Sequence, residues 1–229
     1  MGEAQFPLAR LHPHEGPVLA AWGGHYDHAF IALHPFLRGE PEPWRDPVNW
    51  AQIAWAIGSP SFPDFALAVV LAANGMSGKQ RADADQDLIR RLDSVVKERK
   101  LEYPEDGYLP ASLCPSFAQL FAMLGSDVVI TRDQHSNDEK EMSLAELSEN
   151  PFAVPRFTGA LIDVEERMIV TCFPMDTYHS IVGVQSDALM TFGNDLRLEG
   201  FYAGPETADR WVNEPGTYAY PTWLEANVA

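Results

Sequence analysis

The sequence predicts an α+β fold, in which a helical N-terminal half packs on an antiparallel β-meander formed mainly by the C-terminal half. Apolar residues recur at helical spacing before residue 125. After it, short β-branched and aromatic runs alternate with turn residues. Helices grouped in one part of the chain and strands in another are typical of the α+β class.

We expect one domain over residues 1–229, in three parts. Residues 1–45 are rich in histidine, proline and glycine and should be irregular, apart from a strand at 29–33. Residues 46–125 should be mainly helical, and residues 126–229 mainly antiparallel sheet. A chain of 229 residues buries about 70% of its unfolded surface, so we expect no disulfide or metal to be needed for folding.

The helical part is marked by capping residues. Asp46 followed by Pro47 predicts the start of a helix that ends at Gly58, because an acidic N-cap, an early proline and a terminal glycine are typical of helix ends. Acidic residues at the start and basic residues at the end of 83–100 predict the longest helix. The helix at 116–124 follows a proline, and the capping box from Ser143 to Glu146 predicts the start of a further short helix.

The sheet is predicted from residues 157–202. Five apolar runs there are joined by short turns, which favours a meander of sequential strands. A strand is also expected at 127–131, and the charged segment 132–141 is expected to be a loop.

The charge of the chain limits its partners. The net charge is −17, with 33 acidic and 16 basic residues, and residues 116–229 alone carry 18 acidic and 6 basic residues. We therefore expect no nucleic acid and no anionic membrane as a partner, since phosphates would be repelled. A basic protein partner is permitted, although solubility alone also explains such a charge.

The cysteine count and the apolar runs predict a cytoplasmic protein. Cys114 and Cys172 are the only cysteines, so there is no disulfide framework. The longest apolar run, 65–73, is far shorter than the roughly 20 residues that span a bilayer, and the N-terminus lacks the pattern of a signal peptide. No glycine-rich nucleotide-binding motif occurs, and we expect no cofactor.

Cys114 and His179 form one candidate catalytic site. A thiol at a helix N-terminus has a lowered pKa and lies near free N–H groups that can hold an oxyanion, and Asp187 or Asn194 could orient the histidine. A cysteine at the start of an apolar helix, followed by a sheet that carries histidine, resembles papain-like thiol hydrolases in outline. Pro115 directly after the cysteine departs from that family, and the tryptophan and glycine-rich signature is missing. The alternative interpretation is a buried structural thiol.

The N-terminal histidines form a candidate metal site. The spacing of His12 from His14, and of His25 from His28, can bring imidazoles together on zinc, iron or nickel, with Asp27 as an oxygen donor. The alternative interpretation is a set of loop histidines hydrogen-bonded to the backbone or to water.

These observations favour a non-catalytic protein-binding module that uses an acidic β-rich face, similar in composition to inhibitor and immunity-like proteins. The alternative is a thiol hydrolase through Cys114 and His179, or a metal-dependent hydrolase that uses the N-terminal histidines.

Overall fold

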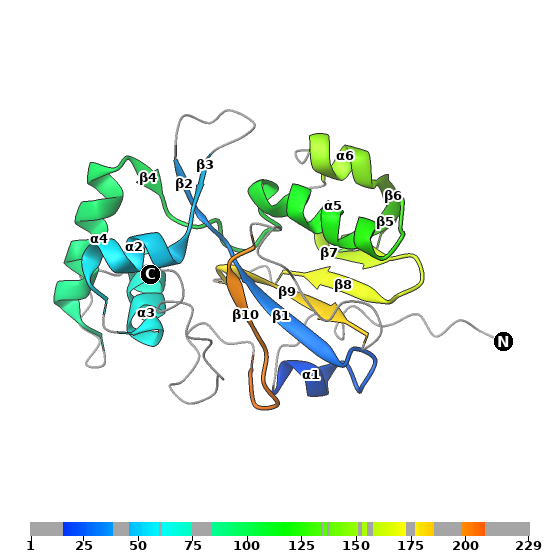
Figure 1. Cartoon of the computed structure of the whole chain (residues 1–229), viewed down its shortest axis with the longest axis horizontal. Coiled ribbons are helices and arrows are strands. Elements are labelled where there is room, and N and C mark those ends of the chain that lie inside the picture. The colour runs from blue at the N-terminus through cyan, green and yellow to red at the C-terminus, as the bar shows by residue number, and fades with distance from the viewer. Residues whose placement is uncertain are drawn as a thin grey trace.

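A seven-stranded antiparallel sheet forms the centre of the molecule (Figure 1). The computed structural model describes residues 16–38, 46–59, 61–74, 84–133, 135–136, 138–150, 153–154, 158–172, 177–185 and 198–208. In spatial order, the strands of the sheet are β10 (Gly200–Tyr202), β1 (His28–Leu33), β9 (His179–Val184), β8 (Met168–Thr171), β7 (Thr158–Asp163), β5 (Val128–Asp133) and β6 (Glu139–Ser143). A second sheet has three short strands in the order β3 (Asp46–Val48), β2 (Phe36–Arg38) and β4 (Leu101–Glu102).

The helices are divided between the two sides of the large sheet rather than gathered on one. The described helices are α1 (Val18–Ala21), α2 (Trp50–Ile57), α3 (Phe62–Ala73), α4 (Gln86–Glu98), the 3₁₀ turn η2 (Ala111–Leu113), α5 (Cys114–Met123) and α6 (Leu144–Glu149). Figure 1 shows α5 and α6 together on one side, and α2, α3 and α4 grouped beside the small sheet.

Two core clusters follow from the alternation of side chains along the strands. In β1, Ala29, Ile31 and Leu33 pack in the first core cluster, which also contains residues of α2, α3 and α4. Phe30 and Ala32 point the other way, into the second core cluster, with residues of α5 and α6. The large sheet is therefore buried on both faces along its central strands.

Several predicted elements are confirmed, and each has a local signal. The helix stop at Gly58 is a left-handed C-cap with φ of 62°, and the residues of α2 that recur at helical spacing are buried, namely Trp50, Ile53, Ala54 and Ile57. Ser143 caps α6 by accepting a hydrogen bond from the Glu146 N–H. The class is α+β, as predicted, and the sheet is built largely from C-terminal strands.

Three predictions of detail are wrong. Asp46 and Pro47 lie in β3, paired with β2, and the helix begins only after Asn49. The charged segment 132–141 is not simply a loop, because it contains the end of β5 and the start of β6. The meander is interrupted, since β1 lies between β9 and β10. The run predicted as a strand at 188–192 lies outside the described residues.

Candidate functional site

Cys114 is the first residue of α5, but its thiol is buried. The Sγ–H group donates to the carbonyl oxygen of Pro110 at 3.6 Å. Burial raises the pKa of Cys114 to about 12, and the negative charge of Glu105 adds to this effect. Desolvation thus outweighs the lowering expected from the helix N-terminus, and the group is a neutral thiol at physiological pH.

The register of the sheet separates His179 from Cys114. His179 pairs with Leu33, and the side chains of directly paired residues share a face. Leu33 packs in the first core cluster, whereas Cys114 packs in the second. The two predicted catalytic side chains therefore belong to opposite faces of the sheet. Asp187, the predicted third member, lies outside the described residues.

A different histidine shares the surroundings of Cys114. His34 is buried, and its Nδ1 lies 2.6 Å from the carbonyl oxygen of Glu105, the residue whose charge also acts on Cys114. Because a carbonyl only accepts, Nδ1 carries the proton, and Nε2 accepts from the hydroxyl of Ser180 at 2.9 Å. Burial is the largest cause that lowers the pKa of His34, to about 3.

This serine–histidine pair has the hydrogen-bond order of a nucleophile, a base and an orienting group. Both side chains, however, have no exposed surface, and a histidine with so low a pKa is a weak base. The pair instead joins the end of β1 to β9 and to the loop that holds Glu105. Sequence reasoning did not find this pair, because nothing local connects His34 with Ser180, 146 residues away.

The candidate metal ligands are divided by the structure. His12 and His14 lie outside the described residues. His25 lies in the loop before β1, where its Nε2 is 3.2 Å from the carbonyl oxygen of Glu166, and His28 is the exposed first residue of β1. In the part of the chain that the structure describes, no group of three histidine, cysteine or acidic side chains is placed to hold a metal.

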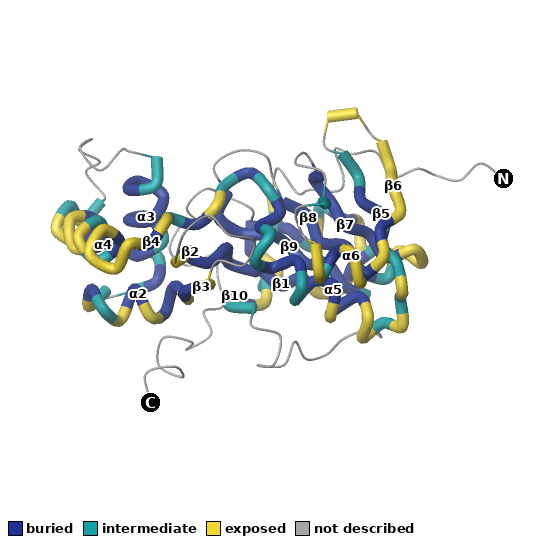
Figure 2. The backbone as a smooth tube through the Cα atoms, turned by 90° about the horizontal axis from the view of Figure 1, so that it is seen from above, coloured by how far each residue is buried: buried dark blue, intermediate teal, exposed yellow. Residues whose placement is uncertain are grey.

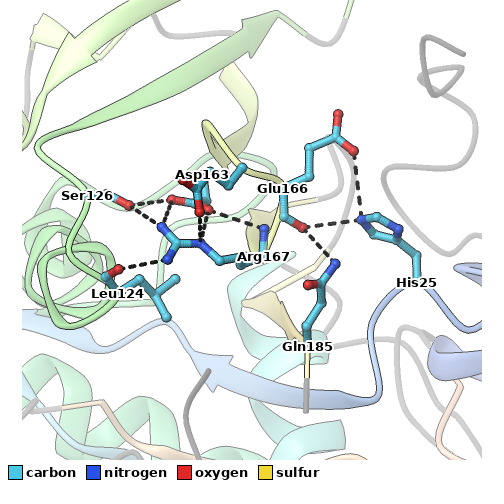
Figure 3. A network of polar contacts seen from close by, with 8 residues as sticks. His25, Leu124, Ser126, Asp163, Glu166, Arg167 and Gln185 are labelled. Carbon is cyan, nitrogen blue, oxygen red and sulfur yellow. Dashed lines mark hydrogen bonds and ion pairs between the residues drawn. The ribbon is translucent and has the colours of Figure 1, made fainter. Parts of the chain in front are cut away.

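An ion pair that sequence reasoning missed joins the β7–β8 turn to α5 (Figure 3). The guanidinium of Arg167 donates to the carboxylate of Asp163, at 2.8 Å from Nε to Oδ2, and to the carbonyl oxygen of Leu124 at 2.9 Å. Ser126 also donates to Asp163. Although burial opposes ionisation, these hydrogen bonds hold the pKa of Asp163 below its usual value. The network ties the hairpin to the C-terminal end of α5, and its sequence signal is an aspartate and an arginine that flank a turn four residues apart.

Exposed acidic residues lie at one end of the sheet. β6 is the edge strand beside β5, and four of its five residues are exposed (Figure 2). Residues 127–150, which hold β5, β6 and α6, carry seven acidic and two basic residues. Glu141 and Glu139 face solvent from the edge strand, and Glu139 forms an ion pair with Arg132.

No single described helix is long and apolar enough to cross a membrane, and only the bent pair α2 and α3 passes the same test by length and composition.

Fold and sites together define an acidic α+β protein whose polar clusters, within the described residues, connect one element to another. Residues 44–213 match the model of DUF2711, a family described as a protein of unknown function, and the chain belongs to this family. The family carries no indication of a catalytic or binding role. No curated protein and no solved structure matches the chain.

Proposed function

We propose that this protein is a non-catalytic binding protein, and that it holds a basic protein partner through the acidic end of its sheet. The main observation in support is the exposed edge strand β6, which presents Glu139 and Glu141 to solvent. Edge strands are commonly shortened, covered or charged, because they are ready-made sites for pairing with another chain.

Charge supports the proposal. Residues 127–150 carry seven acidic and two basic residues, so the field at this end of the molecule attracts a basic surface and raises the rate of encounter. Glu141 has no ion-pair partner among the described residues, and its carboxylate is available to a new cation.

The state of the thiols favours binding over catalysis. Cys114 is buried and protonated, and its face of the sheet is not that of His179. The proposal takes the protein to be cytoplasmic, where buried free thiols such as Cys114 and Cys172 persist. The metal-dependent alternative uses His12, His14, His25 and His28, and it stays a prediction, because His12 and His14 lie outside the described residues.

The experiment compares two charge reversals of equal size. Glu141→Lys changes the proposed surface, and Glu98→Lys changes an exposed residue of α4 far from it in the fold. Each variant and the wild type are immobilised and used to capture partners from the native cell at about 0.05 M and about 0.3 M salt. The captured protein is then purified for calorimetry.

We expect a basic partner whose affinity falls by on the order of tenfold with Glu141→Lys and is unchanged with Glu98→Lys. Its capture should also weaken at the higher salt concentration. Equal affinity of the partner for Glu141→Lys and for Glu98→Lys would show that the partner does not bind at the acidic end of the sheet. The absence of any salt-sensitive partner would overturn the proposed function itself.

A further inference from the structure

We propose that the partner joins the large sheet as an additional antiparallel strand beside β6, and that it presents two basic residues separated by one residue. This inference rests on the proposed function and specifies the chemistry of the partner. It follows from the backbone of β6, from its side chains and from a comparison with the other edge of the sheet.

The backbone of β6 alternates between groups bound to β5 and groups that point outward. The N–H of Asp133 donates to the carbonyl oxygen of Asp138 at 2.9 Å, and the N–H of Leu144 donates to the carbonyl oxygen of Asp127 at 3.0 Å. Both pairs belong to one register, and hydrogen-bonded pairs recur at every second residue of an antiparallel ladder. The N–H and C=O groups of Glu139 and Glu141 therefore point away from β5, toward an incoming strand.

The side chains of β6 specify what that strand carries. Met142 is buried in the second core cluster, so Glu139 and Glu141, one residue out of phase with it, share the opposite face. An incoming strand places one residue opposite each glutamate on that same face. Opposite charges at such directly paired positions are stabilising, which favours a basic–x–basic segment, in which the residue opposite Glu139 shares that carboxylate with Arg132.

A second copy of this chain is a poor occupant of the edge. Outward-pointing residues of one strand must pair with outward-pointing residues of the other. Every register that pairs Glu139 and Glu141 among themselves places glutamate opposite glutamate, which is destabilising. The charges of β6 thus disfavour self-association and favour a different, basic chain.

The other edge strand of the large sheet, β10, is a poorer site for an added strand. β10 has three residues, and two of them, Phe201 and Tyr202, already have other interactions. The exposed residues of β6, Glu139, Lys140, Glu141 and Ser143, belong to a longer strand that ends the sheet on the acidic side.

The test uses the full-length protein and short synthetic peptides that alternate lysine with threonine. In the proposed complex the lysines lie opposite Glu139 and Glu141. The backbone N–H groups of the lysines then point at β6, whereas the backbone N–H groups of the threonines point away from it. Methylation of the backbone nitrogens of the lysine residues should therefore abolish binding. Methylation of the backbone nitrogens of the threonine residues should preserve it. Fluorescence anisotropy at about 0.01 M and about 0.15 M salt measures the affinities.

Two variants test the same geometry from the protein side. Glu141→Pro removes an outward N–H that β5 does not use, so the fold should survive, which circular dichroism checks. We expect peptide affinity to fall at least about tenfold with Glu141→Pro and less with Glu141→Gln, which keeps the N–H group.

The outcomes separate the two proposals. Equal affinity of both N-methylated peptides, combined with a loss of binding in Glu141→Lys, would overturn strand addition and leave a charge-based binding surface. No binding of the unmodified peptide at either salt concentration would also overturn strand addition. The capture experiment with Glu141→Lys and Glu98→Lys decides the proposed function independently, because it uses the native partner.

Discussion

Glu199 caps the N-terminus of helix α2 at Trp50, 149 residues earlier in the chain. One carboxylate oxygen accepts from the N–H of Trp50 at 2.5 Å, and the other accepts from the N–H of Ala51 at 2.8 Å. Asn49, the local N-cap residue, makes no side-chain capping bond. The backbone carbonyl of Glu199 also accepts from the N–H of Leu33 at 2.8 Å. One residue beside β10 thus joins α2 to β1.

Replacing the Glu199 carboxylate should destabilise the protein. Glu199→Ala leaves two backbone donors at the start of α2 without partners, and each such group costs about 1 to 3 kcal/mol when buried. We expect the free energy of unfolding to fall by about 2 to 3 kcal/mol at neutral pH, measured by urea denaturation. Glu206→Ala, an exposed acidic residue of the same C-terminal segment, is the control and should change it by less than about 0.5 kcal/mol.

Glu199 should also make stability depend on pH. Burial raises the pKa of this carboxyl to about 7 against the hydrogen bonds from Ala51 and Trp50, while the unfolded value is about 4.5. A raised pKa means that the folded state binds the proton more tightly. The stability that comes from this tighter proton binding is therefore present in full below about pH 4.5 and is lost as the pH rises through about 7. The carboxylate still caps α2 above that pH, but at a desolvation cost.

The measurement is urea denaturation of wild type and Glu199→Gln across this range. From about pH 5 to about pH 8, the free energy of unfolding should fall by roughly 2 kcal/mol more for the wild type than for the variant, because the glutamine side chain has no proton to release. Parallel pH profiles for the two proteins would contradict the raised pKa of Glu199.

These contacts show why sequence reasoning succeeded with some elements and not with others. The stop of α2 at Gly58 and the cap of α6 at Ser143 are local signals, and both were predicted. The start of α2 was misplaced, because Asp46 and Pro47 are suited to a helix start but pair instead with β2. The cap that begins α2 comes from Glu199, which no local pattern reveals.

The same limit applies to the candidate site. Cys114 at the start of a helix and His179 in a strand were both placed in the right elements. Whether they meet depends on the face to which His179 belongs, and its pairing with Leu33 decides that. Since β1 enters the sheet from the N-terminal segment and lies between β9 and β10, the meander pattern alone could not supply this pairing. The net charge predicted an acidic β-rich face, which stays a prediction, and no local pattern placed exposed glutamates on the edge strand β6.

The ion pair of Arg167 with Asp163 should be a larger contributor to stability than an exposed pair. The Asp163 side chain has no exposed surface, whereas Arg90 and Asp87 pair on the surface of α4. Arg167→Met keeps most of the aliphatic stem but leaves the buried Asp163 carboxylate unpaired. We therefore expect the free energy of unfolding to fall by about 2 to 3 kcal/mol. Arg90→Met is the matched control, with an expected change below about 0.5 kcal/mol.

A double variant identifies the cause of that loss. Asp163→Asn added to Arg167→Met removes the unpaired charge, so it should recover part of the stability that the single variant loses. Equal losses in Arg167→Met and Arg90→Met would show that the Asp163 network contributes no more than an exposed ion pair.

The thiol of Cys114 should be inert in the folded protein. With a pKa near 12, no more than about one thiol in ten thousand is ionised at neutral pH, and the sulfur atom is also buried. We expect iodoacetamide to leave Cys114 unmodified in the native protein and to modify it readily in concentrated urea, as followed by mass spectrometry of the Cys172→Ser variant. The wild type in urea, where both cysteines should react, is the control for reagent activity. Rapid modification of native Cys114 would mean that the helix N-terminus activates the thiol after all, and a thiol hydrolase would then replace the binding protein as the better hypothesis.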